Sequence, residues 1–174
     1  MRAVIAGTQP WTAEAYRRLT REMAGDWRFV QTKAELEEAA LDSPRWIFVL
    51  HWHWMIPEHV WSQVETVNMH AAPLPLFRGG NPIEHQILAG KTSTVVTAHR
   101  VIATLDAGDI YGQRGPVSLA GTKAEILERF IEPCVSLIRE IVDTEPEPYP
   151  QVGEVVTFKR LPKSEMEALW AGRT

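Results

Sequence analysis

Segments of strand length and segments of helix length alternate along this chain. The strand-like segments occupy positions 3–6, 27–30, 46–50, 64–70, 95–103 and 110–117. The run at 46–50 is apolar throughout and lies between Pro44 and Pro57, which is typical of a central parallel strand. Alternation of strands and helices predicts a doubly wound α/β fold, with helices on both faces of a parallel or mixed sheet.

Helix starts are marked by capping patterns between these strands. The sequence Thr-Lys-Ala-Glu occurs at 32–35 and again at 122–125, and each copy predicts a capping box that opens a helix. The second helix is expected to run to about residue 142, with a kink at Pro133. The other predicted helix starts are Thr12, Asn81 before Pro82, and Ser164 with Glu167.

Composition and charge exclude several classes of protein. The chain has 174 residues, of which 45% are hydrophobic and 23% charged, as expected for one globular domain with a substantial core. The net charge is −4 and there is no basic run, so the electrostatic footprint of a nucleic-acid binder is missing. No apolar stretch reaches the roughly 18 residues of a membrane span. We expect a cytoplasmic protein, because no signal peptide precedes the first strand.

The single cysteine excludes an internal disulfide bond. Cys134 lies among apolar residues at helical spacing, which predicts a buried small hydrophobic residue and not a nucleophile. The turn after the first strand, Gly7-Thr8-Gln9-Pro10, does not match the glycine pattern of a dinucleotide-binding site.

The most informative residues are Asn68, His70 and Asp106. Asn68 and His70 are two positions apart, so their side chains project from the same side of a strand. Asp106 follows the next predicted strand, and we expect all three to meet at the carboxyl ends of adjacent strands. An amide, an imidazole and a carboxylate can stabilise an oxyanion and move a proton during acyl transfer. A carboxylate opposite the imidazole is expected to raise the pKa of His70.

Two long runs carry a family resemblance. The segments NMHAAPLPLFRGGNPIEHQILAG and VVTAHRVIATLDAGDIYGQ resemble the folate-dependent formyltransferases, among them the methionyl-tRNA, glycinamide ribonucleotide and amino-sugar formyltransferases. The resemblance implies a Rossmann-like, mostly parallel sheet. It also implies that Asn68, His70 and Asp106 are the catalytic residues. We expect no metal ion in the site.

The resemblance implies a reaction of one-carbon metabolism. A formyl group would move from 10-formyltetrahydrofolate, as co-substrate, to an amine of a small molecule, either an amino-sugar nucleotide or a modified amino acid. Two alternatives remain open: a hydrolase that sends the formyl group to water, and a catalytically silent relative that binds folate or another ligand.

The segment HWHWMIPEHV falls on the loop that walls the folate pocket in this family. The slot for the flat pteridine is expected to consist of Trp54, Met55 and Ile56 with the backbone from Val101 to Leu105. Its polar edge would be read by main-chain groups. Trp52 and Trp54 offer flat surfaces that suit a pteridine, although tryptophan beside a buried strand also serves as core.

Several other residues have more than one interpretation. Arg78, Gly79 and Gly80 precede a helix start, where free N–H groups hold an anionic group of the acceptor or simply form a turn. His99 either faces the acceptor or packs. His51 and His53 are spaced to chelate zinc, to line the pocket, or to pack.

The domain expected is a single one over residues 1–174 with a shortened N-terminal half. Between the first helix and residue 46 there is room for little more than one strand and one helix, whereas the family has more. We expect no tRNA-binding extension of the kind that methionyl-tRNA formyltransferase has. A cleft left open on the acceptor side suits a small amine better than a polyanion, which requires a basic surface. We also expect a homodimer, because a trimmed sheet exposes an apolar edge.

Overall fold

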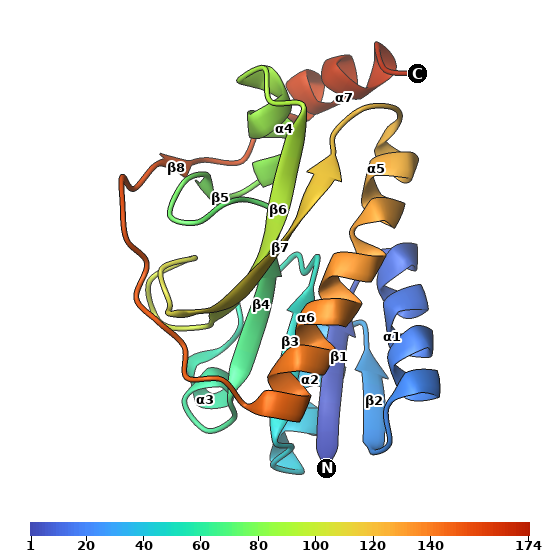
Figure 1. The fold of residues 1–174 in the computed structure, drawn as a ribbon, viewed down its shortest axis with the longest axis vertical. Helices are drawn as coiled ribbons and strands as arrows, with labels where there is room; N and C mark the ends of the chain where they lie inside the picture. Colours follow the sequence, from blue (N-terminus) through green and yellow to red (C-terminus); the bar gives the residue numbers. More distant parts are fainter.

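The computed structural model describes residues 1–174 and contains one six-stranded sheet, ordered β2-β1-β3-β4-β6-β7 (Figure 1). The strands are β1 (Arg2–Gly7), β2 (Asp26–Val30), β3 (Trp46–Leu50), β4 (Thr66–His70), β6 (Ser93–Arg100) and β7 (Ile110–Ser118). β1 to β4 pair in parallel, β6 runs antiparallel to β4, and β7 runs antiparallel to β6. The predicted α/β sheet, with β3 as a buried central parallel strand, is confirmed.

Helices cover both faces of the sheet. One face carries α1 (Pro10–Glu22), α5 (Lys123–Arg129) and α6 (Ile131–Thr144), and the other carries α2 (Lys33–Leu41) and α3 (Glu58–Trp61). Because alternate residues of a strand face opposite sides, each strand contributes to two apolar clusters. We call these faces the α6 face and the α2 face. No helix is both long enough and apolar enough to cross a bilayer.

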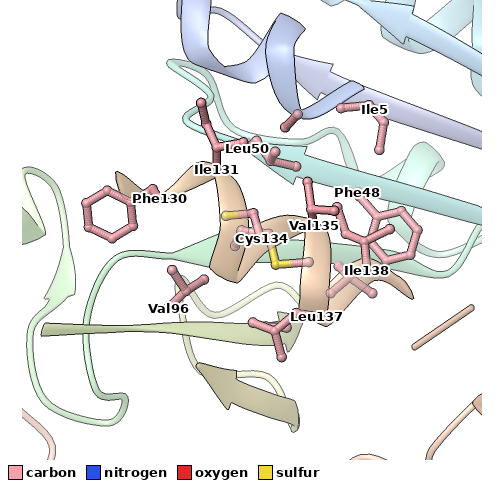
Figure 2. Packing of buried hydrophobic residues seen from close by; sticks show 14 of the residues in the cluster. Ile5, Phe48, Leu50, Val96, Phe130, Ile131, Cys134, Val135, Leu137 and Ile138 are labelled. Carbon is pink, nitrogen blue, oxygen red and sulfur yellow. The ribbon is translucent and has the colours of Figure 1, made fainter. Parts of the chain in front are cut away.

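The α6 face holds the larger core. Figure 2 shows Cys134, Val135 and Ile138 of α6 packed between the strands that carry Phe48 and Val96. Cys134 is 1% exposed and forms no disulfide, and burial raises the pKa of its thiol. The expectation of a buried, unreactive cysteine is therefore confirmed.

The two capping boxes form as predicted, at Thr32 with Glu35 and at Thr122 with Glu125. The predicted cap at Thr12 is wrong. α1 begins two residues earlier, at Pro10, because proline suits the first helical position, and the Thr12 hydroxyl donates to the Gln9 carbonyl.

Ser164 is also not a cap. It lies inside α7 (Lys163–Ala171), whose N-cap residue is Pro162. The helix predicted to run to residue 142 is two helices, α5 and α6, that meet at Phe130. Pro133 is the third residue of α6, where its missing N–H has no intrahelical partner to lose.

A C-terminal strap, residues 145–162, runs from the end of α6 along the outside of the molecule to α7 (Figure 1). Within it β8 (Thr157–Phe158) pairs in parallel with β5 (Arg78–Gly79), which precedes α4 (Pro82–Leu88). Asn81 sits at the predicted N-cap position of α4 but forms no capping bond. Its φ is 54°, and its side-chain oxygen accepts the Leu161 N–H at 3.0 Å, so it holds the strap.

Candidate active site

The candidate catalytic residues project from the α2 face of β4 and β6. Asn68 lies directly opposite His99 across this strand pair. Their neighbours Met69 and Ala98 point to the core on the α6 face. The expected meeting at the carboxyl ends of adjacent strands is therefore wrong in one respect. β6 is antiparallel to β4, so Asp106 is brought in by a loop that follows β6 and folds back over the sheet.

Asp106 lies at the centre of the cluster and is 7% exposed. Its Oδ2 accepts the backbone N–H of Gly79 at 2.8 Å and lies 3.7 Å from Nδ1 of His70. Its Oδ1 lies 3.5 Å from Nε2 of His99. Asp106 has φ 53°, and at Gly108 a side chain would overlap the Arg100 carbonyl, so the turn requires this glycine. The structure thus brings the three predicted residues together and adds His99.

The orientation of His70 follows from its partners. Its Nε2 lies 2.8 Å from the carbonyl oxygen of Phe77, and a carbonyl only accepts, so Nε2 carries a proton. Phe77 has φ 57°, a left-handed conformation that turns its carbonyl toward the ring. Nδ1 of His70 is then the nitrogen that faces Asp106 and is free to gain or lose a proton.

Burial lowers the pKa of His70, and this outweighs the opposing effect of Asp106. The expected rise in its pKa is wrong, because the sequence shows the carboxylate but not the depth of burial. His70 is therefore neutral near pH 7. Burial raises the pKa of Asp106, but the surroundings formed by His99, His70 and the Gly79 N–H lower it by more, so the net shift is downward. Asp106 is the ionised member of the pair.

His99 connects Asn68 to Asp106. Its Nδ1 lies 3.0 Å from the Arg100 carbonyl, so this nitrogen is the donor, and Nε2 lies 3.2 Å from the Asn68 amide nitrogen. In this arrangement Asn68 donates one N–H to His99 and keeps a second N–H for another acceptor. His99 is 2% exposed and also borders the cavity described next.

A cavity of about 1060 Å³ opens beside the cluster. All the residues expected at the folate slot line it: Trp52, Trp54, Met55, Ile56, Val101 and Leu105. Trp54, Met55 and Leu105 are 39%, 65% and 50% exposed, although they are large and apolar. Trp52 lines the cavity and also packs against the core of the α2 face.

Gly79 and Gly80 border the cavity, but Arg78 does not. The Arg78 guanidinium donates to Oε1 of Gln151 in the strap, at 2.8 and 3.2 Å. Gln151 in turn donates to the backbone carbonyls of Asp106 and Gly108. Arg78 therefore supports the Asp106 loop, which departs from the expectation that it contacts the acceptor. The Gly79 N–H is likewise taken by Asp106.

His51 and His53 both line the cavity, with ring centroids 6.0 Å apart. Burial, followed by the charges of His53 and Lys123, lowers the pKa of His51 to about 4. No three histidine, cysteine, aspartate or glutamate side chains are grouped as metal ligands anywhere in the chain. Three interpretations were left open for His51 and His53, and their position in the structure is that of residues that line the pocket.

Sequence reasoning missed Phe77, Gln151 and Glu84. Phe77 acts through its backbone carbonyl, and no pattern of side chains in the sequence reveals such a role. Gln151 lies in a proline-rich spacer with no motif. Glu84 lies in α4, lines the cavity and is only 6% exposed, which the sequence of a short helix does not show.

Comparison with known proteins identifies relatives of this arrangement. Residues 20–141 match the family model described as formyl transferase. Methionyl-tRNA formyltransferase of Thermobifida fusca is 33% identical over 108 residues, which cover 59% of this chain and 33% of that protein. The match thus spans about a third of the length of this curated relative.

Two solved structures resemble the fold. Methionyl-tRNA formyltransferase from Clostridium thermocellum superposes with a TM-score of 0.88 and 29% identity, covering 95% of this chain and 74% of that one. HypX from Aquifex aeolicus in complex with tetrahydrofolic acid gives a TM-score of 0.76 at 24% identity, over 95% of this chain and 30% of that one. At that identity the second likeness concerns the fold alone.

Proposed function

This chain belongs to the formyltransferase family, and on that premise we propose that it moves the formyl group of 10-formyltetrahydrofolate to an amine of a small-molecule acceptor. Formyl-tetrahydrofolate is the donor that the family uses, and the similar HypX structure contains tetrahydrofolic acid. What supports the proposal in this chain is one observation. The free Nδ1 of a neutral, buried His70 faces the ionised Asp106 beside an open cavity.

The folate slot fits the residues present. Trp54, Met55 and Leu105 leave large apolar surfaces exposed around the cavity, and such surfaces mark ligand sites. A flat pteridine between them would cover this area. The segment from Val101 to Leu105 borders the cavity as well, and its backbone groups can read the polar edge of the ring.

His70 has the role of proton carrier. When the acceptor amine attacks, a new N–C bond forms and the amine must lose a proton, which the neutral Nδ1 of His70 can accept. The imidazolium that results lies 3.7 Å from Asp106, close enough for stabilisation directly or through one water. As the bond from the formyl carbon to the folate nitrogen breaks, that nitrogen takes the same proton, and His70 returns to its neutral form.

Asn68 has the role of oxyanion donor. The formyl oxygen gains negative charge during the attack, and the N–H of Asn68 that His99 does not use can donate to it. One such donor contributes about 3–4 kcal/mol to transition-state stabilisation. His99 keeps the amide oriented, because its Nε2 accepts the other N–H. No covalent nucleophile is required, which agrees with the buried, unreactive Cys134.

A small acceptor is favoured over tRNA by charge. The chain carries a net charge of −4, and a polyanion binds to clustered lysine and arginine. The side chains that line the cavity include as many carboxylates, Glu58, Glu84 and Asp106, as cations, Lys123, Lys159 and Arg160. This balance suits a small amine that is neutral or carries charges of both signs.

The test is formyl transfer itself. The protein is incubated with 10-formyltetrahydrofolate and a panel of amines, and mass spectrometry detects the gain of one formyl group on the acceptor. Release of formate in the absence of any amine would instead identify a hydrolase. Binding of 10-formyltetrahydrofolate without loss of its formyl group, with or without amines, would identify a silent binding relative.

A further inference from the structure

Glu84 is a buried carboxylate without an adequate partner. It is 6% exposed, and the indole N–H of Trp170 donates to its Oε1 at a long 3.3 Å. Its Oε2 has no hydrogen bond, and no lysine, arginine or histidine pairs with it. It borders the same cavity as His70 and Asp106.

A buried carboxylate without a cationic partner lowers the stability of the folded chain. Glutamate is almost never fully buried unless it is paired, because removal of its charge from water must be offset by a cation or several donors. The one neutral indole donor contacts Oε1 and leaves Oε2 without a protein partner beside the cavity. The placement of Glu84 on a cavity wall therefore points to a ligand that supplies the missing positive charge.

Lys123 is the complementary group. It is the first residue of α5, is exposed, lines the cavity and forms no ion pair with any carboxylate of the chain. Its Nζ lies 5.7 Å from the centre of the Trp170 ring, whose N–H contacts Glu84. Trp170 thus lies between an unpaired carboxylate and an unpaired ammonium group.

Glu84 and Trp170 lie on the α6-face side of the cavity, and Lys123 is close enough to His51 for its charge to lower the pKa of that ring. Trp170 packs against the core of the α6 face, whereas Trp52 and Ile56 pack against the core of the α2 face. Glu84 is five residues after Gly79, whose N–H holds Asp106, so the chain places it within about 18 Å of the reacting groups. The end of the cavity near Trp170 is where an acceptor would extend from the cluster.

We propose that Glu84 and Lys123 bind the α-ammonium and α-carboxylate of a free amino acid, whose side-chain amine is the group that receives the formyl. This inference rests on the proposed function, since it names the acceptor class for the same site. A sugar nucleotide suits this end poorly, because its diphosphate would meet a buried carboxylate and a single lysine.

Three matched acceptors separate the two charges. L-Ornithine carries both, 1,4-diaminobutane lacks the carboxylate, and 5-aminopentanoate lacks the α-ammonium. Glucosamine is added as an amino sugar that has hydroxyl groups in place of the α-ammonium and α-carboxylate. We expect L-ornithine to be formylated on its side chain with a kcat/KM at least about 10-fold above each of the others.

Two variants assign the charges to residues. Glu84→Gln should raise KM for L-ornithine by about 10- to 100-fold and leave 5-aminopentanoate unaffected. Lys123→Met should raise the KM for L-ornithine by about 3- to 10-fold and leave the KM for 1,4-diaminobutane unchanged. The effect is smaller than that of Glu84→Gln because Lys123 is exposed. Glu167→Gln and Lys163→Met are the controls, because these residues pair on the outer surface of α7 and do not line the cavity.

Binding is measured separately from transfer. L-Ornithine is titrated by calorimetry into wild type and Glu84→Gln, each saturated with tetrahydrofolate. If Glu84→Gln weakens L-ornithine binding but no amine is formylated, the subsite is upheld and the proposed function is rejected. Preference for glucosamine, an equal effect of Glu84→Gln on every amine, or no L-ornithine binding to wild type would overturn the subsite, and formylation of another amine would still support the transferase.

Discussion

The two ring nitrogens of His70 have different roles, one structural and one chemical. Nε2 is held by the Phe77 carbonyl, and Nδ1 faces Asp106 and the cavity. We expect His70→Ala and Asp106→Asn each to lower kcat by about 10²- to 10⁴-fold, because each removes part of the proton transfer. Tetrahydrofolate binding should persist, since the apolar walls of the slot are unchanged.

The matched control is His59→Ala, because His59 lies on the exposed surface of α3 and pairs only with Glu37. Single-turnover kinetics with 10-formyltetrahydrofolate, followed by fluorescence titration of tetrahydrofolate, measure the two effects. Full turnover in His70→Ala would remove the histidine from the mechanism.

His51 predicts how stability depends on pH. Its pKa is about 4 in the folded chain, below the value of about 6.5 expected when it is unfolded. Between these values the unfolded chain binds the proton and the folded chain does not, so stability falls as pH drops from about 6.5 to 4. The loss should approach about 3 kcal/mol.

His51→Asn should reduce this pH dependence, and asparagine tolerates the left-handed φ of 50° at this position. Urea unfolding of wild type and variant at pH 7.5 and pH 4.5 gives the comparison. An equal loss of stability in both proteins would assign the effect to other groups.

Which residues could be predicted from the sequence depends on how each one acts. Asn68, His70 and Asp106 act through side chains in a recognisable order, and the structure brings them together. Phe77 and Gly79 act through backbone groups, which leave no chemical pattern in the sequence. The pKa of His70 was expected to move in the wrong direction, because its burial arises from contacts distant along the chain.

At the scale of elements, the two capping boxes could be predicted from the sequence, whereas the caps at Thr12 and Ser164 and the long-range strand pairing were not predicted correctly. The capping boxes at Thr32 and Thr122 satisfy backbone donors within one turn, so the sequence contains the whole interaction. The direction of β6 depends on how the connection from β4 is routed, and no residue in β6 itself determines it. The sequence of β5 and β8 also does not determine their pairing. Each is a strand of two residues that forms by pairing with the other.

The β5–β8 pair is expected to be sensitive at Gly79. This residue has φ 102°, and a side chain would overlap the Phe158 carbonyl oxygen. Gly79→Ala should lower the free energy of unfolding by about 1–3 kcal/mol through backbone strain alone. It should also lower turnover, because the N–H that holds Asp106 must move.

Gly90→Ala is the matched control, since Gly90 has φ 76° but open space around it. We expect it to lose stability and keep its turnover. Urea denaturation and formyl-transfer rates on both variants test this, and similar turnover in the two would mean that the Gly79 N–H does not position Asp106.

At the scale of the whole molecule, ligand binding and stability are linked. Tetrahydrofolate at about 100 times its Kd should add about 2.7 kcal/mol to the free energy of unfolding, which for a chain of this size raises Tm by about 5–10 °C. Trp54→Ala should require a higher concentration for the same rise, because it removes one wall of the slot.

Differential scanning fluorimetry measures the shift, and quenching of tryptophan fluorescence on titration gives an independent readout from Trp52 and Trp54 in the slot. An unchanged Tm together with unchanged fluorescence at saturating tetrahydrofolate would rule out this slot.

The C-terminal strap and α7 determine when the site is completed during synthesis on the ribosome. Asn68, His70 and Asp106 are synthesised well before the residues that complete their surroundings. Gln151 fastens the Asp106 loop, Phe158 lies against Gly79, and Trp170 contacts Glu84. A growing chain that has already formed β1 to β7 therefore holds the reactive groups in an unfinished pocket. Catalytic competence should arise only after the last turn of α7 has emerged from the exit tunnel.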